Sequence, residues 1–223
     1  MDFMAQLKLK CPSIDGLLDG GIEDRVITQV YGEAGTGKTN LCLQAIRECA
    51  SQDKKIVVID SEGISLKRLE QICTEGYNYK KILDKIIFFR PLSFEQQEKM
   101  IKNAVKIKDI SLIVVDTINL FYRLNLEEDR EGTMRSFVRQ MANLQIAARE
   151  KKLWVIITEQ VYTDKNGEIK PFTNRDSEHM IKTILKLEKK EEKLSHRKAT
   201  IIKHRSQPEG KKTDFKITQT GLK

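Results

Sequence analysis

The sequence contains no long apolar run. Over 223 residues, no apolar segment approaches the roughly 20 residues that a helix needs to cross a bilayer. The start, residues 1–10, also has no apolar stretch of the kind that a signal peptide carries. We therefore expect a cytoplasmic protein that does not insert into membranes.

Cysteine is scarce, and its spacing excludes two kinds of site. Cys11, Cys42, Cys49 and Cys73 form no Cys-x-x-Cys pair, and no histidine lies near them at the spacing of a metal site. We interpret them as reduced, mostly buried, small apolar residues.

Internal repeats and low-complexity linkers are also missing from the sequence. Its length therefore predicts one globular domain over residues 1–223.

The excess positive charge is concentrated at the C-terminal end of the chain. The net charge is +8, and residues 179–223 contain 13 Lys and Arg against 5 Asp and Glu. The rest of the chain is therefore balanced. A lysine-rich segment of this kind can be a sheet edge that is protected against pairing with other chains. It can also be a face that binds polyanions, and charge alone does not separate the two.

Continuous apolar runs alternate with amphipathic stretches along the first two thirds of the chain. The expected strands are residues 26–31, 55–60, 86–89, 112–116 and 153–158, and the expected helices are 39–50, 65–75, 93–106 and 134–150. This alternation is typical of an α/β fold with a mainly parallel central sheet that helices cover on both faces. Residues 181–187, 199–203 and 214–218 then look like strands joined by polar turns, which predicts an antiparallel C-terminal extension.

A glycine-rich turn lies between the first expected strand and the first expected helix. It satisfies the pattern GxxxxGK[ST] in full, with Gly32, Glu33, Ala34, Gly35, Thr36, Gly37, Lys38 and Thr39. Its glycines allow the loop to wrap closely, so that backbone N–H groups and the helix N-terminus face phosphates. We expect Lys38 to neutralise the β and γ phosphates and Thr39 to offer its hydroxyl to Mg²⁺. Asn40, the next residue, is included in the expected nucleotide site.

Two carboxylates follow apolar strands at the edge of the sheet where the glycine-rich turn also lies. Asp116 ends one strand and would act on Mg²⁺, although an aspartate in such a place can also cap a turn or helix. Glu62 lies two residues beyond another strand and would orient and deprotonate a water for attack on the γ-phosphate. The alternative for Glu62 is a solvated loop glutamate.

Several segments together resemble one family. They are PSIDGLL (12–18), GGI (20–22), GEAGTGKT (32–39), VVIDSEG (57–63), LIVVDT (112–117) and ITEQV (157–161). In order and spacing they resemble the ATPase core of the archaeal and eukaryotic RecA-type recombinases, over nearly the whole chain. The resemblance implies a RecA-type P-loop fold with ATP and Mg²⁺ as ligands. It also implies that Glu62 activates water, and that Gln160 senses the γ-phosphate and signals toward a DNA-binding loop.

The chain departs from that family in three places. Only about ten residues precede Cys11, so we expect no N-terminal helical DNA-binding domain and no polymerisation segment. The first DNA loop would fall within residues 122–134, where four carboxylates would oppose binding to a phosphodiester backbone. The second, within residues 161–178, has little glycine and mixed charge. The pattern is most similar to the short archaeal paralogue of the main recombinase, and favours a monomer or dimer over a filament.

Lys203, His204 and Arg205 follow the expected strand 199–203 and precede a Pro-Glu-Gly turn. They would contact DNA phosphates. Alternatively, they resemble a Lys-x-Arg element of related RecA-fold ATPases that reaches into the ATP site of a neighbouring subunit. The remaining interpretation is a set of exposed basic residues at a strand end.

The function expected from these features is an ATP-binding accessory protein in homologous recombination and DNA repair. It would bind DNA through its basic C-terminal third, hydrolyse ATP weakly with Mg²⁺, and assist a recombinase or a junction-processing protein. Two alternatives stay open. One is a recombinase motor with DNA-stimulated hydrolysis, and the other is a signalling ATPase related to KaiC that needs no DNA.

Overall fold

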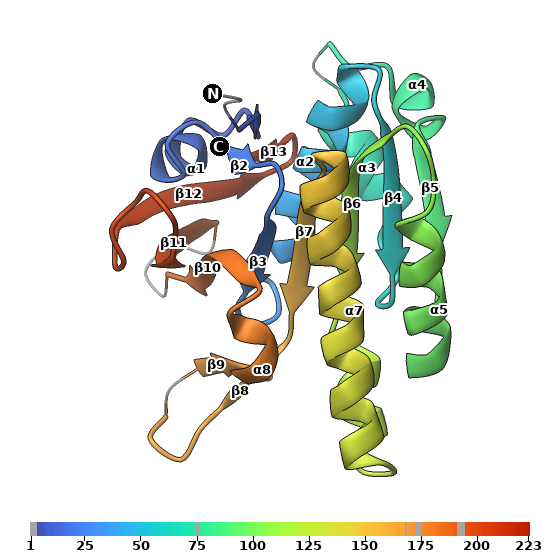
Figure 1. Ribbon diagram of the computed structural model, residues 1–223. Helices are drawn as coiled ribbons and strands as arrows, with labels where there is room; N and C mark the ends of the chain where they lie inside the picture. The colour runs from blue at the N-terminus through green and yellow to red at the C-terminus, as the bar shows by residue number, and fades with distance from the viewer. Residues whose placement is uncertain (1–3, 75, 168, 173–174, 191–194) are drawn as a thin grey trace.

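The computed structural model describes residues 4–74, 76–167, 169–172, 175–190 and 195–223. Within these ranges the centre is a sheet of nine strands (Figure 1). In order across the sheet they are β13 (Gly221–Leu222), β12 (Lys212–Thr218), β11 (His196–Lys203), β10 (Ile181–Lys189), β3 (Ile27–Tyr31), β7 (Trp154–Glu159), β6 (Ile110–Asp116), β4 (Lys55–Asp60) and β5 (Ile86–Phe89).

The sheet is parallel from β10 to β5 and antiparallel from β11 to β13. The expected mainly parallel α/β fold with an antiparallel extension is therefore confirmed. One detail of the prediction was wrong, because β10 pairs parallel with β3 and belongs to the parallel part. Since β3 and β10 run in the same direction, the carboxyl end of β10 lies beside the glycine-rich turn that follows β3.

Helices cover both faces of the sheet (Figure 1). One face carries α1 (Pro12–Leu17), α2 (Lys38–Ser51), α3 (Leu66–Ile72) and α4 (Tyr79–Leu83), and the other carries α5 (Phe94–Ala104), α6 (Leu120–Asn125) and α7 (Arg130–Lys151). Side chains of a strand alternate between the two layers: Val58 and Val114 pack on the first, and Val57 and Val115 on the second. Burial on both faces explains why the parallel strands are continuous apolar runs.

The first expected DNA loop, residues 122–134, is mostly helical, which corrects the prediction. Helix α6 ends at Asn125, and α7 begins at Arg130, four residues earlier than expected. The Asp129 carboxylate caps α7 by accepting from the Gly132 N–H at 3.0 Å. The acidic residues therefore stabilise a helix N-terminus, whose dipole favours negative charge, in place of forming an open loop.

The second expected DNA loop, residues 161–178, contains a short hairpin of β8 (Val161–Thr163) and β9 (Ile169–Pro171) and the helix α8 (Arg175–Glu178). Residues 168, 173 and 174 of this segment lie outside the described residues. The rings of Tyr162 and Phe172 pack together with their centroids 4.7 Å apart. The hairpin and the N-terminal end of α7 extend past the carboxyl edge of the sheet (Figure 1).

The amino edge of the sheet is closed by the start of the chain. Strand β1 (Gln6–Leu7) pairs antiparallel with β2 (Ile22–Glu23), and the indole N–H of Trp154 donates to the Ala5 carbonyl at 3.2 Å. Lys54 lies over the indole ring, 4.4 Å from its centroid. None of the described helices has the length and apolar character to cross a membrane.

Candidate functional site

The glycine-rich turn between β3 and α2 has a backbone that only glycine fits in two places. Gly32 has φ 155°, and a Cβ there would lie 2.2 Å from the Leu187 carbonyl oxygen of β10. Gly37 has φ 106°, and its Cβ would lie 3.1 Å from Ile217 of β12. The C-terminal strands therefore pack directly on the turn and fix its shape. Buried Thr36 closes it by donating to the Glu33 carbonyl at 2.8 Å.

Lys38 is the first residue of α2, and its ammonium points back into the turn. It donates to the Gly32 carbonyl at 2.7 Å and to the Glu33 carbonyl at 3.1 Å. Burial lowers the pKa of Lys38, against the opposing influence of the Glu62 and Asp116 carboxylates. A partly desolvated cation in a cradle of glycines is suited to neutralise a polyphosphate.

Thr39 and Asp116 meet at the base of the site. The Thr39 hydroxyl donates to Asp116 Oδ2 at 2.8 Å, and the Thr158 hydroxyl of β7 donates to Asp116 Oδ1. Burial raises the pKa of Asp116, although these hydroxyls lower it in part. A hydroxyl and a buried carboxylate side by side fit Mg²⁺, which takes few protein oxygens together with water and phosphate. Among the described residues, no three His, Cys, Asp or Glu side chains come together as a metal site.

Glu62 follows β4 in a loop that Asp60 builds. The Asp60 carboxylate accepts from the backbone N–H groups of Gly63 at 2.7 Å and Ile64 at 2.9 Å. Glu62 Oε1 accepts from the side-chain amide of Gln160 and from the Thr117 hydroxyl at 3.2 Å. Glu62 is exposed, and these two hydrogen bonds hold its Oε1 beside the cavity.

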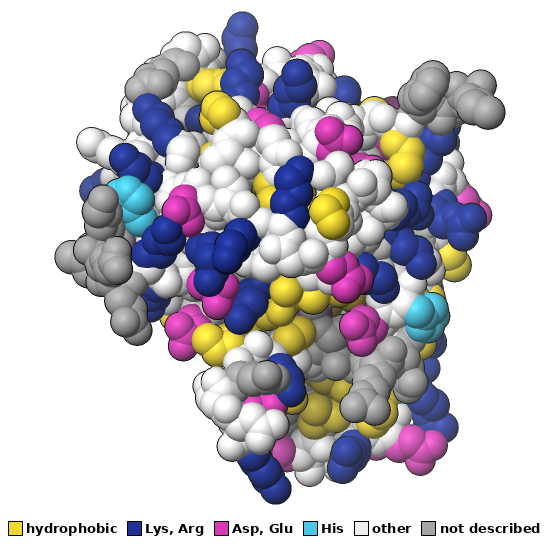
Figure 2. All heavy atoms as spheres, turned by 90° about the vertical axis from the view of Figure 1, so that its left-hand side faces the viewer, with side chains coloured by type: hydrophobic (Ala, Val, Ile, Leu, Met, Phe, Trp, Pro, Cys, Tyr) yellow, Lys and Arg dark blue, Asp and Glu magenta, His cyan; other side chains and the backbone are white. Residues whose placement is uncertain are grey.

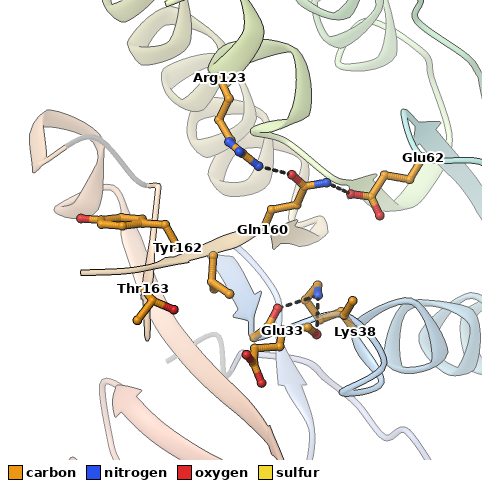
Figure 3. Close-up of a pocket in the computed structure, with 10 residues that line it drawn as sticks. Glu33, Lys38, Glu62, Arg123, Gln160, Tyr162 and Thr163 are labelled. Carbon is orange, nitrogen blue, oxygen red and sulfur yellow. Dashed lines mark hydrogen bonds between the residues drawn. The ribbon is translucent and has the colours of Figure 1, made fainter. Parts of the chain in front are cut away.

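Gln160 lies between Glu62 and a further side chain, Arg123 of α6 (Figure 3). Its amide N–H donates to Glu62, and its Oε1 accepts from Arg123 at 2.6 Å. Buried Asn119 holds the Gln160 backbone, accepting from its N–H at 2.9 Å and donating to its carbonyl at 3.0 Å. The Gln160 amide is therefore held at its nitrogen and its oxygen, and Asn119 holds the backbone of the same residue.

Lys38, Glu62 and Gln160 line a cavity of about 340 Å³ at the carboxyl edge of the sheet, whereas Thr39 and Asp116 are not part of its lining. The residues that line it are Gly32, Glu33, Ala34, Lys38, Glu62, Arg123, Gln160, Val161, Tyr162 and Thr163. The arrangement places a cation, a carboxylate and an amide around the same space (Figure 3). It can bind a polyphosphate and hold a water near the terminal phosphate.

One side chain of the expected nucleotide site, Asn40, is hydrogen-bonded elsewhere. The Asn40 side chain accepts from Arg68 Nε at 2.7 Å, and Arg68 also donates to the Thr218 carbonyl at 2.6 Å. The Asn40 side chain thus faces α3 and the C-terminal strands. The Gly35 carbonyl accepts from Arg197 Nε of β11 at 2.9 Å.

Sequence reasoning missed Arg123, Asn119 and Arg197. Asn119 and Arg123 lie about 40 residues from Gln160 in the chain, and Arg197 lies farther still from Gly35. The only signal in the sequence was that Arg123 lies one helical turn after Asn119. That spacing does not indicate that Arg123 contacts Gln160.

Lys203 and Arg205 lie away from the nucleotide cavity of their own chain. Strand β11 runs antiparallel to β10, so Arg197 is at the carboxyl edge and Lys203 is toward the amino edge. Lys203 Nζ donates to the Glu178 carbonyl at 3.1 Å, and Arg205 contacts Met4 Sδ at 3.5 Å. A trans-acting role for these side chains would therefore need the site of a second copy.

Four cations lie at or beside the turn between β11 and β12. Farther along the sheet, Glu188 pairs with Lys186 and Lys198, both at 3.0 Å. At the turn, none of the described carboxylates forms an ion pair with Lys203, Arg205, Lys211 or Lys212. Figure 2 shows the side of the C-terminal strands, where Lys and Arg side chains outnumber Asp and Glu.

His204 shapes this turn. Its Nδ1 accepts from the backbone N–H groups of Ser206 and Gln207, each at 3.2 Å. Its Nε2 is buried and meets no hydrogen-bond partner among the described residues. Because Nδ1 accepts these hydrogen bonds, the imidazole ring is neutral. The ring stabilises the backbone that follows Lys203, and its Nε2 points into the protein.

Comparison with known proteins places this geometry in a family. The Rad51 family model matches residues 3–223. The chain is 42% identical to the "DNA repair and recombination protein RadB" of Methanococcoides burtonii, over 98% of this chain and 97% of the relative. It is 38% identical to the protein of the same name from Thermoplasma acidophilum, over 94% and 90%.

A solved structure has the same architecture. It is described as "Crystal structure of the RadB recombinase", and it aligns with a TM-score of 0.86 and 36% identity over 97% of this chain and 98% of that one. The similarity covers the nucleotide cavity and the C-terminal strands together. The chain therefore belongs to the Rad51 family, in which the relatives that it resembles are RadB proteins.

Proposed function

We propose that this chain is an ATP-binding accessory protein in homologous recombination and DNA repair. The observation that carries the nucleotide part is the meeting of Thr39 and Asp116, 2.8 Å apart, beneath a cavity that Lys38 and Glu62 line. The relatives' printed names supply the biological setting. The partner would be a recombinase or a junction-processing protein, and the chain would act as a monomer or dimer.

The residues of the site divide the work on ATP. Gly32 to Gly37 wrap the phosphates with backbone N–H groups, Lys38 neutralises their charge, and Thr39 and Asp116 would hold Mg²⁺, which lowers the charge of the β and γ phosphates. Glu62 orients a water. Gln160 and Thr117 already donate to Glu62 Oε1, so only Oε2 is left for that water, which supports weak hydrolysis.

The DNA part of the proposal rests on the turn between β11 and β12. Lys203, Arg205, Lys211 and Lys212 are cations without ion-pair partners among the described residues, and such groups bind phosphates. They lie toward the amino edge, opposite the cavity. ATP would therefore influence DNA binding through a conformational change and without direct contact.

DNA binding measured by fluorescence anisotropy tests this part. We expect Lys203→Ala/Arg205→Ala to weaken binding and to reduce the slope of log K against log salt by about 0.7 to 0.9 for each phosphate contact that is lost. Wild type would be titrated with ATP, with ADP and without nucleotide.

Lys99→Ala/Lys102→Ala is the matched control, because both lysines are exposed on α5 and the loss of charge is the same. Equal weakening in both variants would show that net charge alone acts. Absence of DNA binding in every nucleotide state would remove DNA from the proposal. A phosphate-release assay that depended on Lys203 and Arg205 but not on DNA would favour the trans-acting finger.

A further inference from the structure

Two adjoining hollows lie between the start of the chain and the C-terminal strands, where α1 packs beside β12 (Figure 1). The wider one, of about 590 Å³, is lined in part by Pro12 and Phe215. The narrower one, of about 280 Å³, is lined in part by Arg47. Lys10 and Lys223 line both, so the two hollows form one groove, the α1–β12 groove. None of the described residues lines both this groove and the nucleotide cavity.

Positive side chains gather along the groove. Lys216 and Lys223 are directly opposite each other, because their backbones exchange hydrogen bonds of 2.7 and 2.9 Å. Like charges in opposite positions of an antiparallel pair are destabilising. Neither Lys10 nor Lys216 forms an ion pair with a described carboxylate, and Asp214, which lines the wide hollow, pairs with Lys190. An anion in the groove would therefore relieve an unfavourable arrangement of charges.

The narrow hollow contains the ring of Tyr77, which two cations approach. The guanidinium of Arg47 lies 4.3 Å from the ring centroid, and the ammonium of Lys10 lies 6.0 Å from it. Arg47 is buried and already pairs with Glu48 at 2.7 Å. Lys10 has only the ring, which stabilises an ammonium less than a carboxylate does. A carboxylate that enters this hollow would therefore pair with Lys10.

The backbone of Lys10 has an unusual conformation. Its φ is 55°, in the left-handed region that residues other than glycine rarely adopt. The preceding residue enforces it, because the Leu9 N–H donates to Asp15 Oδ1 at 2.8 Å and the Leu9 carbonyl accepts from Gln44 at 2.8 Å. Backbone strain of this kind is found more often at functional sites than elsewhere. A glycine would fit here without strain, yet the chain has a long cationic side chain that lines the groove.

We propose that the α1–β12 groove docks an acidic segment of a partner protein, with a carboxylate beside Lys10 and an apolar side chain in the wide hollow. The cations select the sign of the segment by charge complementarity. The wide hollow selects a peptide over a nucleic acid, since an aliphatic side chain can fill the space beside Pro12 and Phe215 and a phosphodiester backbone cannot. This docking role goes beyond the proposed work on ATP and DNA and depends on neither.

Fluorescence anisotropy with a labelled peptide tests the docking site. The probe alternates pairs of glutamates with single leucines, and two comparison peptides have glutamine in place of glutamate or lack the leucines. We expect the glutamate–leucine peptide to bind most tightly, and Lys10→Gln/Lys216→Gln to weaken its binding about tenfold, because two charge contacts are lost. Lys99→Gln/Lys102→Gln is the matched control on α5, and it should change the affinity less than about twofold.

Lys10→Gly separates docking from folding. Glycine adopts a left-handed backbone without strain, so the midpoint of thermal unfolding should stay the same or rise. Peptide affinity should nevertheless fall about three- to fivefold, because the ammonium is gone. Charge reversal gives a second check. Lys10→Glu/Lys216→Glu should lose the acidic peptide and should bind a peptide that has lysine in place of glutamate.

Three outcomes would overturn the docking site. One is equal weakening in the groove variant and the α5 variant, since net charge alone would then attract the peptide. Another is displacement of the labelled peptide by single-stranded DNA together with weaker DNA binding in Lys10→Gln/Lys216→Gln, which would assign the groove to nucleic acid. The third is a glutamate–leucine peptide that does not bind at about 1 mM. Each of these would leave the nucleotide cavity and its proposed function unaffected.

Discussion

At the scale of single residues, Gly32 is the position where the turn tolerates no side chain. A Cβ would lie 2.2 Å from the Leu187 carbonyl, and backbone atoms cannot move aside as a flexible side chain can. We expect Gly32→Ala to lower the free energy of unfolding by about 3 kcal/mol and to weaken ATP binding, since the turn must shift. Urea unfolding and calorimetry measure the two effects.

Gly63 provides the comparison for Gly32. Its φ is +93°, but a Cβ there meets nothing within 4 Å. Gly63→Ala should therefore cost only the backbone strain, about 1 kcal/mol, and keep ATP binding. Equal losses of unfolding free energy in the two variants would show that the close approach of the Leu187 carbonyl to Gly32 has no effect on stability.

His204 makes stability depend on pH. Burial lowers the pKa of the His204 imidazole below its usual 6.5, because desolvation disfavours the charged ring. The folded state therefore binds fewer protons than the unfolded state, so the contribution to stability is complete above pH 6.5 and is lost as the pH falls below that value. Thermal unfolding of wild type and His204→Ala between pH 5 and 8, a range of about three units around the usual histidine value, would measure it.

The neighbouring charges act on the same titration. Glu23 and Asp19 favour the protonated ring, while Lys211 and Arg205 disfavour it. An identical pH profile in His204→Ala would show that the pH dependence does not come from His204. The same variant should weaken DNA binding only modestly, since Lys203 and Arg205 remain.

At the scale of elements, the last strand, β13, is hydrogen-bonded to α2, the helix that follows the glycine-rich turn. Gln44 of α2 is buried, accepts from the Leu222 N–H at 2.7 Å and donates to the Leu9 carbonyl at 2.8 Å. We expect Gln44→Ala to lower the free energy of unfolding by about 2 to 4 kcal/mol, because buried backbone groups lose their partners. Chemical denaturation measures this loss.

Gln52 at the end of the same helix is the control. It is exposed, and its side-chain contact is with Lys54. Gln52→Ala should change the unfolding free energy by less than about 0.5 kcal/mol. A loss in Gln44→Ala that is no larger would mean that β13 contributes little to holding α2.

The elements that were predicted correctly are those with a long local signal. Strands β4 and β5 have the expected limits, because each is a continuous apolar run that ends at a polar residue or proline. The missed elements, such as α4, α6 and β13, have six residues or fewer, which is too short for a periodic pattern. The start of α7 was missed because its acidic residues were interpreted as a loop and were not recognised as a cap.

The same reasoning explains the candidate site. The glycine-rich turn is contiguous in sequence, so its residues could be named before its shape was known. Arg123 and Asn119 were not predicted, because their contacts with Gln160 depend on how α6 packs beside the end of β7. These contacts can be identified only once the fold shows which distant segments of the chain lie side by side.

At the scale of the whole molecule, acidic and basic groups lie at opposite edges of the sheet. The acidic segment 127–131 is beyond the carboxyl edge, and Lys203 and Arg205 are toward the amino edge, separated by a strand of eight residues or roughly 25 Å. This exceeds the Debye length of about 8 Å at physiological salt. Glu127→Gln/Glu128→Gln should therefore change DNA affinity less than twofold.

Anisotropy at several salt concentrations checks this expectation. A gain of tenfold or more would place the DNA near α6 and α7, and would contradict the basic turn as the main contact. A small gain only at low salt fits unscreened, long-range repulsion.

Trp154 gives the molecule an optical label at one known place. It is the only tryptophan, it is buried at the amino edge, and its indole N–H is bonded to Ala5. Its emission should shift when the start of the chain detaches or the sheet melts, and should stay constant when a nucleotide enters at the carboxyl edge. Global unfolding can thus be followed in the presence of saturating ATP with no added dye.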